Sequence, residues 1–500
     1  MIKHRSIASY FISLLAFAII VTTPSHQAFA QEGAALEELV VTARKREENI
    51  LDVPLSITAL TSENIEAKGI GEFKDIISFT PGFHFAEHSV GRADRSNRIL
   101  VIRGMHISQE NDHQQAATVF VDGAPMHGSV IAGLEDAERI EVVRGPQSAY
   151  FGRATLAGAV NFVTKTPGQE SKSKVVAEFG KYGTRNLGAS FEGPLSDTVS
   201  YRVAVSSQDT DGQYKAANDP SLTLGERSTT SFAGTLYFEP SDRFNAKIRF
   251  HTWEDDDGPG AAFGYGVNNG EELFDCNLAN STLAVRSGGG NWFCGVAPFP
   301  SAEYIQYDAA MTQQKQDLLN GVATPGLTID TITDNPFLDG FGFAREADQL
   351  SINMNYEMES GITITSIIAS NENRWMALDD LDRRATADLG TRNVSLLNGR
   401  DLEDSSVEVR LTSPQDQRLR WMLGVSKFSF EGKRTSGFNI FGTVRSLSLG
   451  NVFDIETSGI FAALEYDITD ELTVNIEGRR QKDEVEEARS SGAEFVKGTF

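Results

Sequence analysis

The stretch RIEVVRGPQSAYFGRATLAGAVNFVTK, residues 139–165, decides how the first third of the chain is interpreted. A phosphate-binding P-loop needs Gly-x4-Gly-Lys-Ser/Thr, so that backbone amides surround the phosphate oxygens. Here six residues separate Gly145 from Gly152, and Pro146 lacks an amide hydrogen. Arg153 also stands where the P-loop lysine would be. The spacing therefore argues against nucleotide binding.

The same stretch is better explained as two strands joined by a turn-rich loop. Two apolar runs, 140–143 and 159–163, flank the glycine-rich segment. Glycine permits sharp bends and close approach of one backbone to another. We therefore expect Gly145, Gly152 and Gly158 to serve one of these two purposes.

The surrounding residues, 36–168, predict a compact mixed α/β unit. Thr61 or Ser62 can cap a short helix that ends near Gly69, and a second helix over 72–79 is terminated by Pro81-Gly82. Strand-like runs are predicted at 99–103, 118–121, 140–143 and 159–164.

The first thirty residues have the three parts of a secretory signal peptide. Lys3, His4 and Arg5 are basic, residues 11–21 are apolar, and Ala28-Phe29-Ala30 is a small-residue cleavage site before Gln31. The apolar run is too short to span a bilayer as a helix. We expect residues 1–30 to be removed during export.

Composition narrows the class of protein. With 69 acidic and 45 basic side chains, the formal charge of −24 repels nucleic acid and argues against such a partner. Cys276 and Cys294 lie close in an exported chain, so a Cys276–Cys294 disulfide is predicted. They have no accompanying histidines, so no metal site is predicted there.

Beyond about residue 172 the pattern becomes one of alternation. Residues 244, 246, 248, 250 and 252 are mostly apolar, whereas Asn245, Lys247, Arg249 and His251 between them are polar. Similar alternation recurs near residues 201–205, 350–356, 407–411 and 472–476. Soluble β-sandwiches also show it. About a dozen such segments with long connections favour a transmembrane antiparallel β-barrel, in which Lys247, Arg249 and His251 face the lumen.

A very long connection is expected over about 254–344, and it begins with the acidic cluster EDDDG at 254–258. The cluster lacks the ligand order of a calcium-binding EF-hand loop. We therefore interpret it as part of a solvated loop on the exterior of the barrel.

Together these features resemble the TonB-dependent outer-membrane receptors. LEELVVTARK from Leu36 resembles the TonB box of that family and the basic tail that follows it. The segments VPLSITALT (53–61), FKDIISFTPGF (73–83), IRG (102–104) and VFVDGAP (119–125), with the opening stretch, resemble its plug domain. The barrel resemblance rests on pattern alone.

The resemblance implies a mainly β fold in which an N-terminal α/β plug fills a barrel of 22 strands. It divides the chain into the TonB box and linker (31–48), the plug (49–168) and a partial barrel (172–500). About a dozen strands fit into this last part, so we expect the sequence to be a fragment that stops within the barrel. An incomplete barrel leaves strand edges that a membrane cannot satisfy.

The resemblance also assigns residues. The expected TonB-binding residues are Glu37, Glu38, Leu39, Val40, Val41 and Thr42. The plug motif residues are Arg103, Gly104, Asp122, Gly123, Arg144, Gly145, Pro146, Gly152, Arg153 and Gly158. The three arginines among them are candidates for pairing with acidic residues of the barrel wall.

The TonB box is short, β-branched and apolar, as suits a segment that adds as a strand to the sheet of a partner. The other interpretation of Leu39–Val41 is a strand internal to the plug. The implied partners are the TonB protein, outer-membrane lipid and a small-molecule or metal-chelate ligand.

The function expected from this resemblance is energised uptake of a scarce, bulky solute, most often a ferric siderophore. Oligosaccharide, cobalamin and other organic solutes remain open, and a passive porin or adhesin would not need the plug. The row Lys247, Arg249 and His251 would suit an anionic chelate, or it simply faces water in the lumen. No hydrolase motif is present, and no enzyme activity, cofactor or metal is expected.

Overall fold

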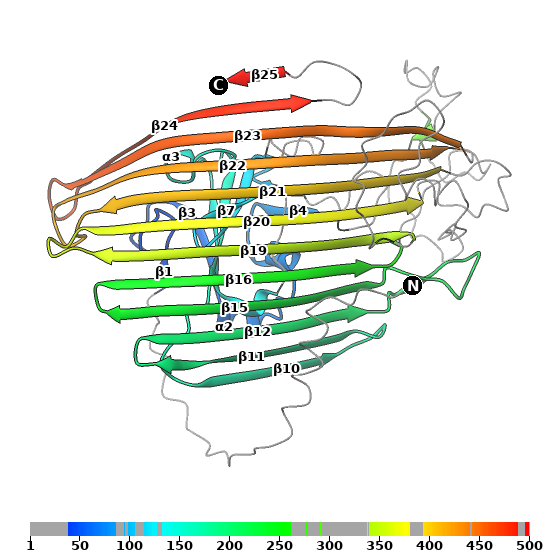
Figure 1. Ribbon diagram of the computed structural model, residues 1–500, viewed down its shortest axis with the longest axis horizontal. Helices are drawn as coiled ribbons and strands as arrows, with labels where there is room; N and C mark the ends of the chain where they lie inside the picture. The colour runs from blue at the N-terminus through cyan, green and yellow to red at the C-terminus, as the bar shows by residue number, and fades with distance from the viewer. Residues whose placement is uncertain are drawn as a thin grey trace, which may run out of the picture.

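The computed structural model describes residues 39–86, 95, 99–105, 115–127, 133–261, 276–277, 291–292, 338, 340–380, 394–440, 443–488 and 496–499. Within them, a small five-stranded sheet packs against one face of a large twelve-stranded sheet. In Figure 1 the small sheet and its helices, coloured blue to cyan, lie behind the large sheet. The predicted signal peptide, residues 1–30, lies outside the described residues.

The small sheet is the central element of the plug. Its strands are β3 (Ser56–Thr61), β8 (Ala137–Arg144), β9 (Gly158–Thr164), β6 (Ala117–Val121) and β7 (Ala124–Met126), in that spatial order. Strands β6 and β9 are parallel, and the other neighbours are antiparallel. Strand β8 therefore lies inside the sheet, hydrogen-bonded on both edges.

The helices of the plug are short. Helix α2 (Ser62–Ala67) is capped by the Thr61 hydroxyl, which accepts a hydrogen bond from the Asn64 amide at 3.2 Å. Residues Phe73–Phe79 form the 3-10 helix η1 rather than an α-helix. The Phe73 ring packs 5.5 Å from the Phe162 ring of β9, so η1 covers the sheet.

The remaining plug elements are small. They are β1 (Val40–Val41), β2 (Glu48–Asn49), β4 (Phe83–Ala86), β5 (Ile99–Ile102), the 3-10 helix η2 (Leu134–Asp136) and α3 (Ser148–Phe151). Strands β1 and β2 pair with each other, as do β4 and β5.

Gly158 confirms the expected close approach of backbone in the opening stretch. It has φ +153°, and a Cβ atom there would lie 2.2 Å from the Val143 carbonyl oxygen of the neighbouring strand. Gly152, at φ +78°, faces the Arg479 guanidinium of the large sheet, which a Cβ atom would approach to 2.8 Å. One glycine thus permits sheet pairing within the plug, and the other permits contact with the wall.

The large sheet is antiparallel throughout, and we call it the wall. Its strands in order are β10 (Lys172–Phe179), β11 (Arg185–Ser196), β12 (Val199–Thr210), β15 (Arg227–Ser241), β16 (Phe244–Asp257), β19 (Gly342–Glu357), β20 (Thr363–Asp380), β21 (Val394–Thr412), β22 (Leu419–Ile440), β23 (Thr443–Asp467), β24 (Thr473–Ala488) and β25 (Val496–Thr499). Two connections contain four further short strands. Residues 211–226 contain β13 (Tyr214–Lys215) and β14 (Thr223–Leu224), and residues 258–341 contain β17 (Cys276–Asn277) and β18 (Asn291–Trp292).

The two faces of the wall differ as the alternation predicts. On β16, Ile248 and Phe250 are 42% and 41% exposed on the outer face. Arg249 and His251 alternate with them and are 1% exposed, because the plug covers the inner face. An apolar outer face is typical of a strand wall that contacts lipid.

The acidic cluster at 254–257 corrects one prediction. It does not belong to the long connection, because β16 continues to Asp257 and pairs with β19 from Phe343 onward. The connection between these two strands begins at residue 258 and ends at residue 341.

The two ends of the wall differ in the length of their connections. Five hairpins turn at one end, over 197–198, 242–243, 358–362, 413–418 and 468–472, and we call this the short-turn end. The connections 211–226 and 258–341 lie at the opposite, long-loop end. Among the described helices, none combines the length and apolar character needed to cross a membrane.

Candidate functional site

The predicted TonB box begins outside the described residues, since the structure shows nothing of Glu37 and Glu38. Val40 and Val41 form β1, which pairs with β2, and Val41 is fully buried. The Lys45 amide donates to the Thr42 carbonyl at 2.9 Å and closes the turn between the two strands. The described part of the predicted TonB box is thus folded in a two-stranded sheet that is separate from the five-stranded plug sheet. We call residues 39–49 the coupling segment.

Thr42 attaches the coupling segment to the middle of the plug sheet. Its amide donates to Glu141 Oε1 at 2.9 Å, and its hydroxyl lies 3.1 Å from both carboxylate oxygens. Glu141 lies on β8 and is fully buried. On the other side, Asn161 of β9 donates to the Thr42 hydroxyl at 3.1 Å.

The basic run Arg44, Lys45 and Arg46 attaches the same segment to the wall. Glu465 of β23 accepts from Arg44 at 2.8 Å and from Arg46 at 2.7 Å. Lys45 pairs with Glu408 of β21, and its ammonium lies 5.0 Å from the Phe461 ring centroid. The coupling segment therefore bridges plug and wall.

Lys45 is the most perturbed of these cations. Burial lowers its pKa to about 8, while the charge of Glu408 opposes that shift. Its φ of +61° is uncommon for a residue with a side chain. The position is held by the tertiary contacts of the ammonium group rather than by local preference.

On other strands of the wall, β12 and β16, the charges are reversed, and carboxylates of the plug meet cations of the wall. Lys247 lies 3.2 Å from Asp122 and donates to the Thr164 carbonyl at 2.6 Å. Asp136 accepts from Arg249 at 3.0 Å and from Arg202 at 2.9 Å. Lys247 and Arg249 thus face inward, and each pairs with a carboxylate of the plug.

His251, the third residue of the predicted lumen-facing row, has apolar surroundings. Its ring stacks on Trp253 of the same strand, with centroids 4.9 Å apart. Trp253 belongs to the hydrophobic cluster that includes the plug core. His251 therefore packs at the boundary of plug and wall.

A third cluster lies near the long-loop end. Arg95 of the plug donates to Asp257 at 2.7 Å and lies 2.9 Å from Asp255, and Arg345 of β19 reaches Asp255 at 3.2 Å. Two members of the acidic run that we interpreted as a solvated loop are therefore buried ion-pair partners. No group of three or more metal-binding side chains occurs among the described residues.

The plug arginines have different surroundings. Arg144 donates to the Pro81 carbonyl at 2.7 Å, within the plug. Burial lowers the pKa of Arg153, and the charge of Asp483 on β24 opposes that shift. For Arg103 and Arg144 the described part of the chain contains no ion pair with a wall residue.

The other plug motif residues lie at turns. Asp122 (φ +49°) and Gly123 (φ +83°) form the β6–β7 turn, and Asp122 accepts hydrogen bonds from the Thr164 amide and hydroxyl at 2.8 and 2.6 Å. Gly104 has φ +77°, while Gly145 has φ +103° and precedes the exposed Pro146. The predicted disulfide lies outside what can be described, since nothing is placed for Cys294 or for the Cys276 side chain.

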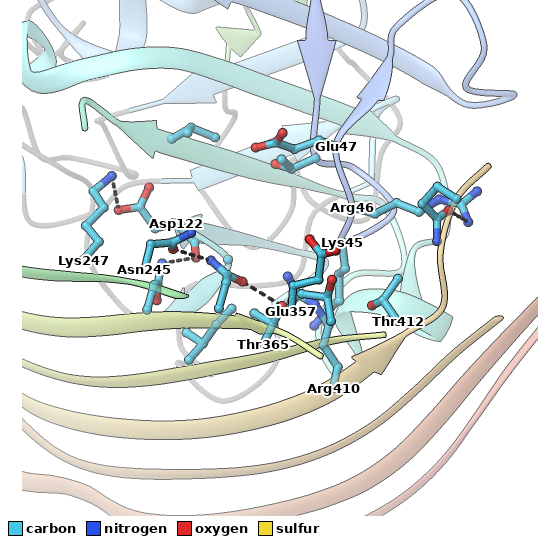
Figure 2. Close-up of a pocket in the computed structure, with 18 of the residues that line it drawn as sticks. Lys45, Arg46, Glu47, Asp122, Asn245, Lys247, Glu357, Thr365, Arg410 and Thr412 are labelled. Atoms are coloured by element: carbon cyan, nitrogen blue, oxygen red, sulfur yellow. Dashed lines mark hydrogen bonds and ion pairs between the residues drawn. The ribbon is translucent and has the colours of Figure 1, made fainter. Parts of the chain in front are cut away.

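A cavity of about 1070 Å³ separates plug from wall at the short-turn end (Figure 2). Its wall side carries amides and hydroxyls in a chain, in which Thr365 donates to Asn355 at 2.8 Å and Asn355 donates to Asn245 at 3.0 Å. Its plug side includes Thr42 and Lys45 of the coupling segment. The volume is comparable with that of pockets for sizeable organic ligands.

Several of these residues were not singled out from the sequence. They are Arg46, Arg95, Asp136, Glu141, Arg202, Glu408 and Glu465. Arg44 and Lys45 belong to the basic tail of LEELVVTARK, for which no partners were predicted. The alternation on β21 did place Glu408 and Arg410 on the polar face of a strand. It carries no information on which plug residue lies opposite, because the partners are hundreds of residues apart in sequence.

Comparison with known proteins agrees with this architecture. Residues 49–159 match the TonB-dependent Receptor Plug Domain. The chain is 26% identical over 211 residues to the vitamin B12 transporter BtuB of Photobacterium profundum, covering 42% of this chain and 34% of that protein. It is 26% identical over 234 residues to the ferrioxamine B receptor of Salmonella typhimurium, covering 42% and 32%. The chain thus spans about a third of the length of these relatives.

Solved structures extend the likeness to the wall. The ferric yersiniabactin uptake receptor FyuA of Yersinia pestis superposes with a TM-score of 0.64 at 14% identity, covering 89% of this chain and 60% of that one. The ferripyoverdine receptor of Pseudomonas aeruginosa gives 0.62 at 16% identity, covering 92% and 56%. With its plug domain and a wall that matches part of their barrels, the chain belongs to the TonB-dependent receptors.

Proposed function

We propose that the protein takes up a scarce, bulky solute across the outer membrane with energy delivered by TonB. The observation that carries this proposal is the coupling segment, which is bonded to the plug through Thr42 and to the wall through its basic run. A force on this segment acts on both bodies at once. The outer membrane has no nucleotide supply or ion gradient of its own, so such a force must come from a partner.

The exposed apolar outer face of the wall supports a place in the outer membrane. The cavity at the short-turn end supports passage between plug and wall, because it is already lined by polar groups. It adjoins the coupling segment, so movement of that segment changes its boundary.

For the solute we propose a ferric siderophore. Support comes from relatives described as a ferrioxamine B receptor and a ferric enterobactin receptor. A vitamin B12 transporter matches with similar identity and coverage, so cobalamin is the second candidate. An oligosaccharide is the third solute class considered from the sequence, and no relative reported above supports it.

The test is uptake by iron-starved cells that express the complete gene. The probes are radiolabelled iron in ferrioxamine B and in ferric enterobactin, and radiolabelled vitamin B12. Each is measured with the wild type, with Val41→Pro and with the strand-compatible control Val41→Ala. Proline removes the amide that strand pairing with the partner needs, so we expect uptake to be lost in Val41→Pro and largely kept in Val41→Ala.

Uptake of an iron chelate that survives Val41→Pro would contradict energised transport. Uptake of vitamin B12 alone would keep the energised mechanism and replace the siderophore with cobalamin. Absence of uptake for every probe, with the receptor present in the outer membrane, would remove both solute assignments.

A further inference from the structure

The carboxylate of Glu141 is an unusual attachment point for a segment that has to move. Glu141 is fully buried on β8, which is hydrogen-bonded to β3 on one side and to β9 on the other. Its carboxylate accepts hydrogen bonds from the Thr42 amide at 2.9 Å and from Arg139 Nε at 2.8 Å. The Thr42 hydroxyl adds a third donor. Two of the three donors therefore belong to the coupling segment.

Thr42 is attached to the plug sheet by a side-chain contact rather than by strand pairing. Strand β1 pairs with β2 only through Val40 and Val41, and the next amide, that of Thr42, is satisfied by the Glu141 side chain. Hydrogen bonds of Thr42 thus attach the segment to the plug sheet, and Val41 and Ala43 on either side of it are buried. A pull along the segment reaches β8 through this contact, while neighbouring strands hold β8 in place.

We propose that Glu141 is the release point of the predicted TonB box: its contact with Thr42 keeps the box folded against the plug sheet, and loss of that contact frees the box for strand pairing with the partner. The inference rests on the proposed function. Loss of Thr42 leaves a buried carboxylate with Arg139 as its remaining donor, which costs more than loss of a neutral hydrogen bond. That cost opposes spontaneous release.

Release of Thr42 also alters the cavity. Thr42, Arg139 and Asn161 all line it, and Glu141 lies directly behind Thr42. When Thr42 leaves, the cavity gains access to a charged carboxylate that water can solvate. Release of the box therefore also extends the polar cavity between plug and wall.

The experiment measures how often the box detaches, without solute and without TonB. A cysteine is introduced as Val40→Cys in the complete gene product, and the rate of its modification by a small polar maleimide is followed on the purified protein. The protein without the introduced cysteine gives the background from Cys276 and Cys294. The rate is then compared in Glu141→Ala, Glu141→Gln, Thr42→Val and Glu138→Gln backgrounds.

Glu138→Gln is the matched control. Glu138 lies on the same strand and accepts from Arg139 at 2.9 Å, yet its contact does not involve Thr42. We expect Glu141→Ala to raise the modification rate about tenfold or more, which corresponds to the loss of one buried charge-assisted hydrogen bond. Glu141→Gln and Thr42→Val should give smaller increases, and Glu138→Gln should leave the rate unchanged.

Equal rates in the parent and in Glu141→Ala would overturn the proposal, and so would an equal increase in Glu138→Gln. A parent rate as fast as that of an unfolded peptide would also overturn it. Should Glu141→Ala fail to assemble, Glu141→Gln and Thr42→Val carry the same comparison. A merely structural role of Glu141 would lower the unfolding midpoint without changing the modification rate under native conditions. Failure of uptake would leave these rates unaffected, so the two proposals fail separately.

Discussion

The charges at the contact between plug and wall change sign from one group of wall strands to another. Beside the coupling segment the plug supplies the cations Arg44, Lys45 and Arg46, and the wall supplies Glu408 and Glu465. On β12 and β16, the plug supplies the carboxylates Asp122 and Asp136, and the wall supplies Lys247, Arg202 and Arg249. Near the long-loop end the signs reverse again, with Arg95 of the plug against Asp255 and Asp257.

This difference between the charged clusters indicates how the plug can be held in place and still contain a segment that moves. Displacement of the plug would separate each charge from its buried partner, which is unfavourable. The cluster on β12 and β16 involves residues next to the plug sheet, whereas the cluster on β21 and β23 involves the short coupling segment. We infer that the first anchors the plug and the second responds to force.

The strongest test of the anchor is Asp136→Ala. It removes the carboxylate that faces both Arg202 and Arg249, all of them buried. Arg202 keeps Glu192 and Arg249 keeps Gln349, so compensation is partial. We expect the plug to lose about 3 kcal/mol of stability.

The measurement is hydrogen exchange of the β8 and β9 amides in the purified receptor. Glu138→Ala is the control, because Glu138 is about half exposed and pairs with Arg139 inside the plug. Unchanged protection of β8 and β9 in Asp136→Ala would show that this cluster does not anchor the plug.

A smaller effect on stability is expected from titration of Lys45, which pairs with Glu408 of β21. Its pKa is lowered to about 8 in the folded protein from an ordinary value of 10.5. Between these two values the unfolded chain binds more protons than the folded one, so the free energy of unfolding rises with pH. Below about pH 8 both states are protonated, and the contribution of Lys45 is constant.

The check is the urea midpoint of the plug from about pH 7 to pH 10, compared between wild type and Lys45→Met. Methionine keeps a long apolar side chain beside Phe461 and does not titrate. We expect the wild-type midpoint to rise relative to that of Lys45→Met above about pH 8. If the urea midpoints of the wild type and Lys45→Met change with pH in parallel, Lys45 is more solvated than the structure shows.

The smallest effect should come from Glu66→Gln. Glu66 of α2 pairs with Lys174 of β10 at 2.5 Å, yet the two side chains are 67% and 49% exposed. Solvent screens such a pair, so we expect the stability of the plug to change by less than about 0.5 kcal/mol. A loss of stability comparable with that of Asp136→Ala would show that burial does not determine how much each ion pair contributes. The distinction between an anchoring ion pair and a surface ion pair would then be wrong.

Much of the fold could be predicted from the sequence, because the relevant signals are local. The four strands expected between residues 99 and 164 are present, and alternation over 244–252 separated Ile248 and Phe250 from Arg249 and His251. Membership of the TonB-dependent receptors also agrees with the prediction that the chain is no enzyme.

The errors have a common cause. EDDDG was interpreted as part of a solvated loop because it lacks the ligand order of an EF-hand loop and was placed at the start of the long connection. Arg95 and Arg345 neutralise two of its acidic residues, and both arginines are about 90 or more residues away in sequence. Lys247 and Arg249 were likewise placed on the inner face, and their ion pairs with Asp122 and Asp136 of the plug were not predicted.

The sequence by itself determined the faces of the strands, the glycines that allow close approach, and the motifs of the plug. These follow from backbone geometry and side-chain periodicity, which act over a few residues. Only the tertiary structure decided that the predicted TonB box is folded against Glu141 and that each charged cluster has its opposite across the plug boundary. Those features depend on burial and on electrostatic contacts between distant segments, which local sequence does not encode.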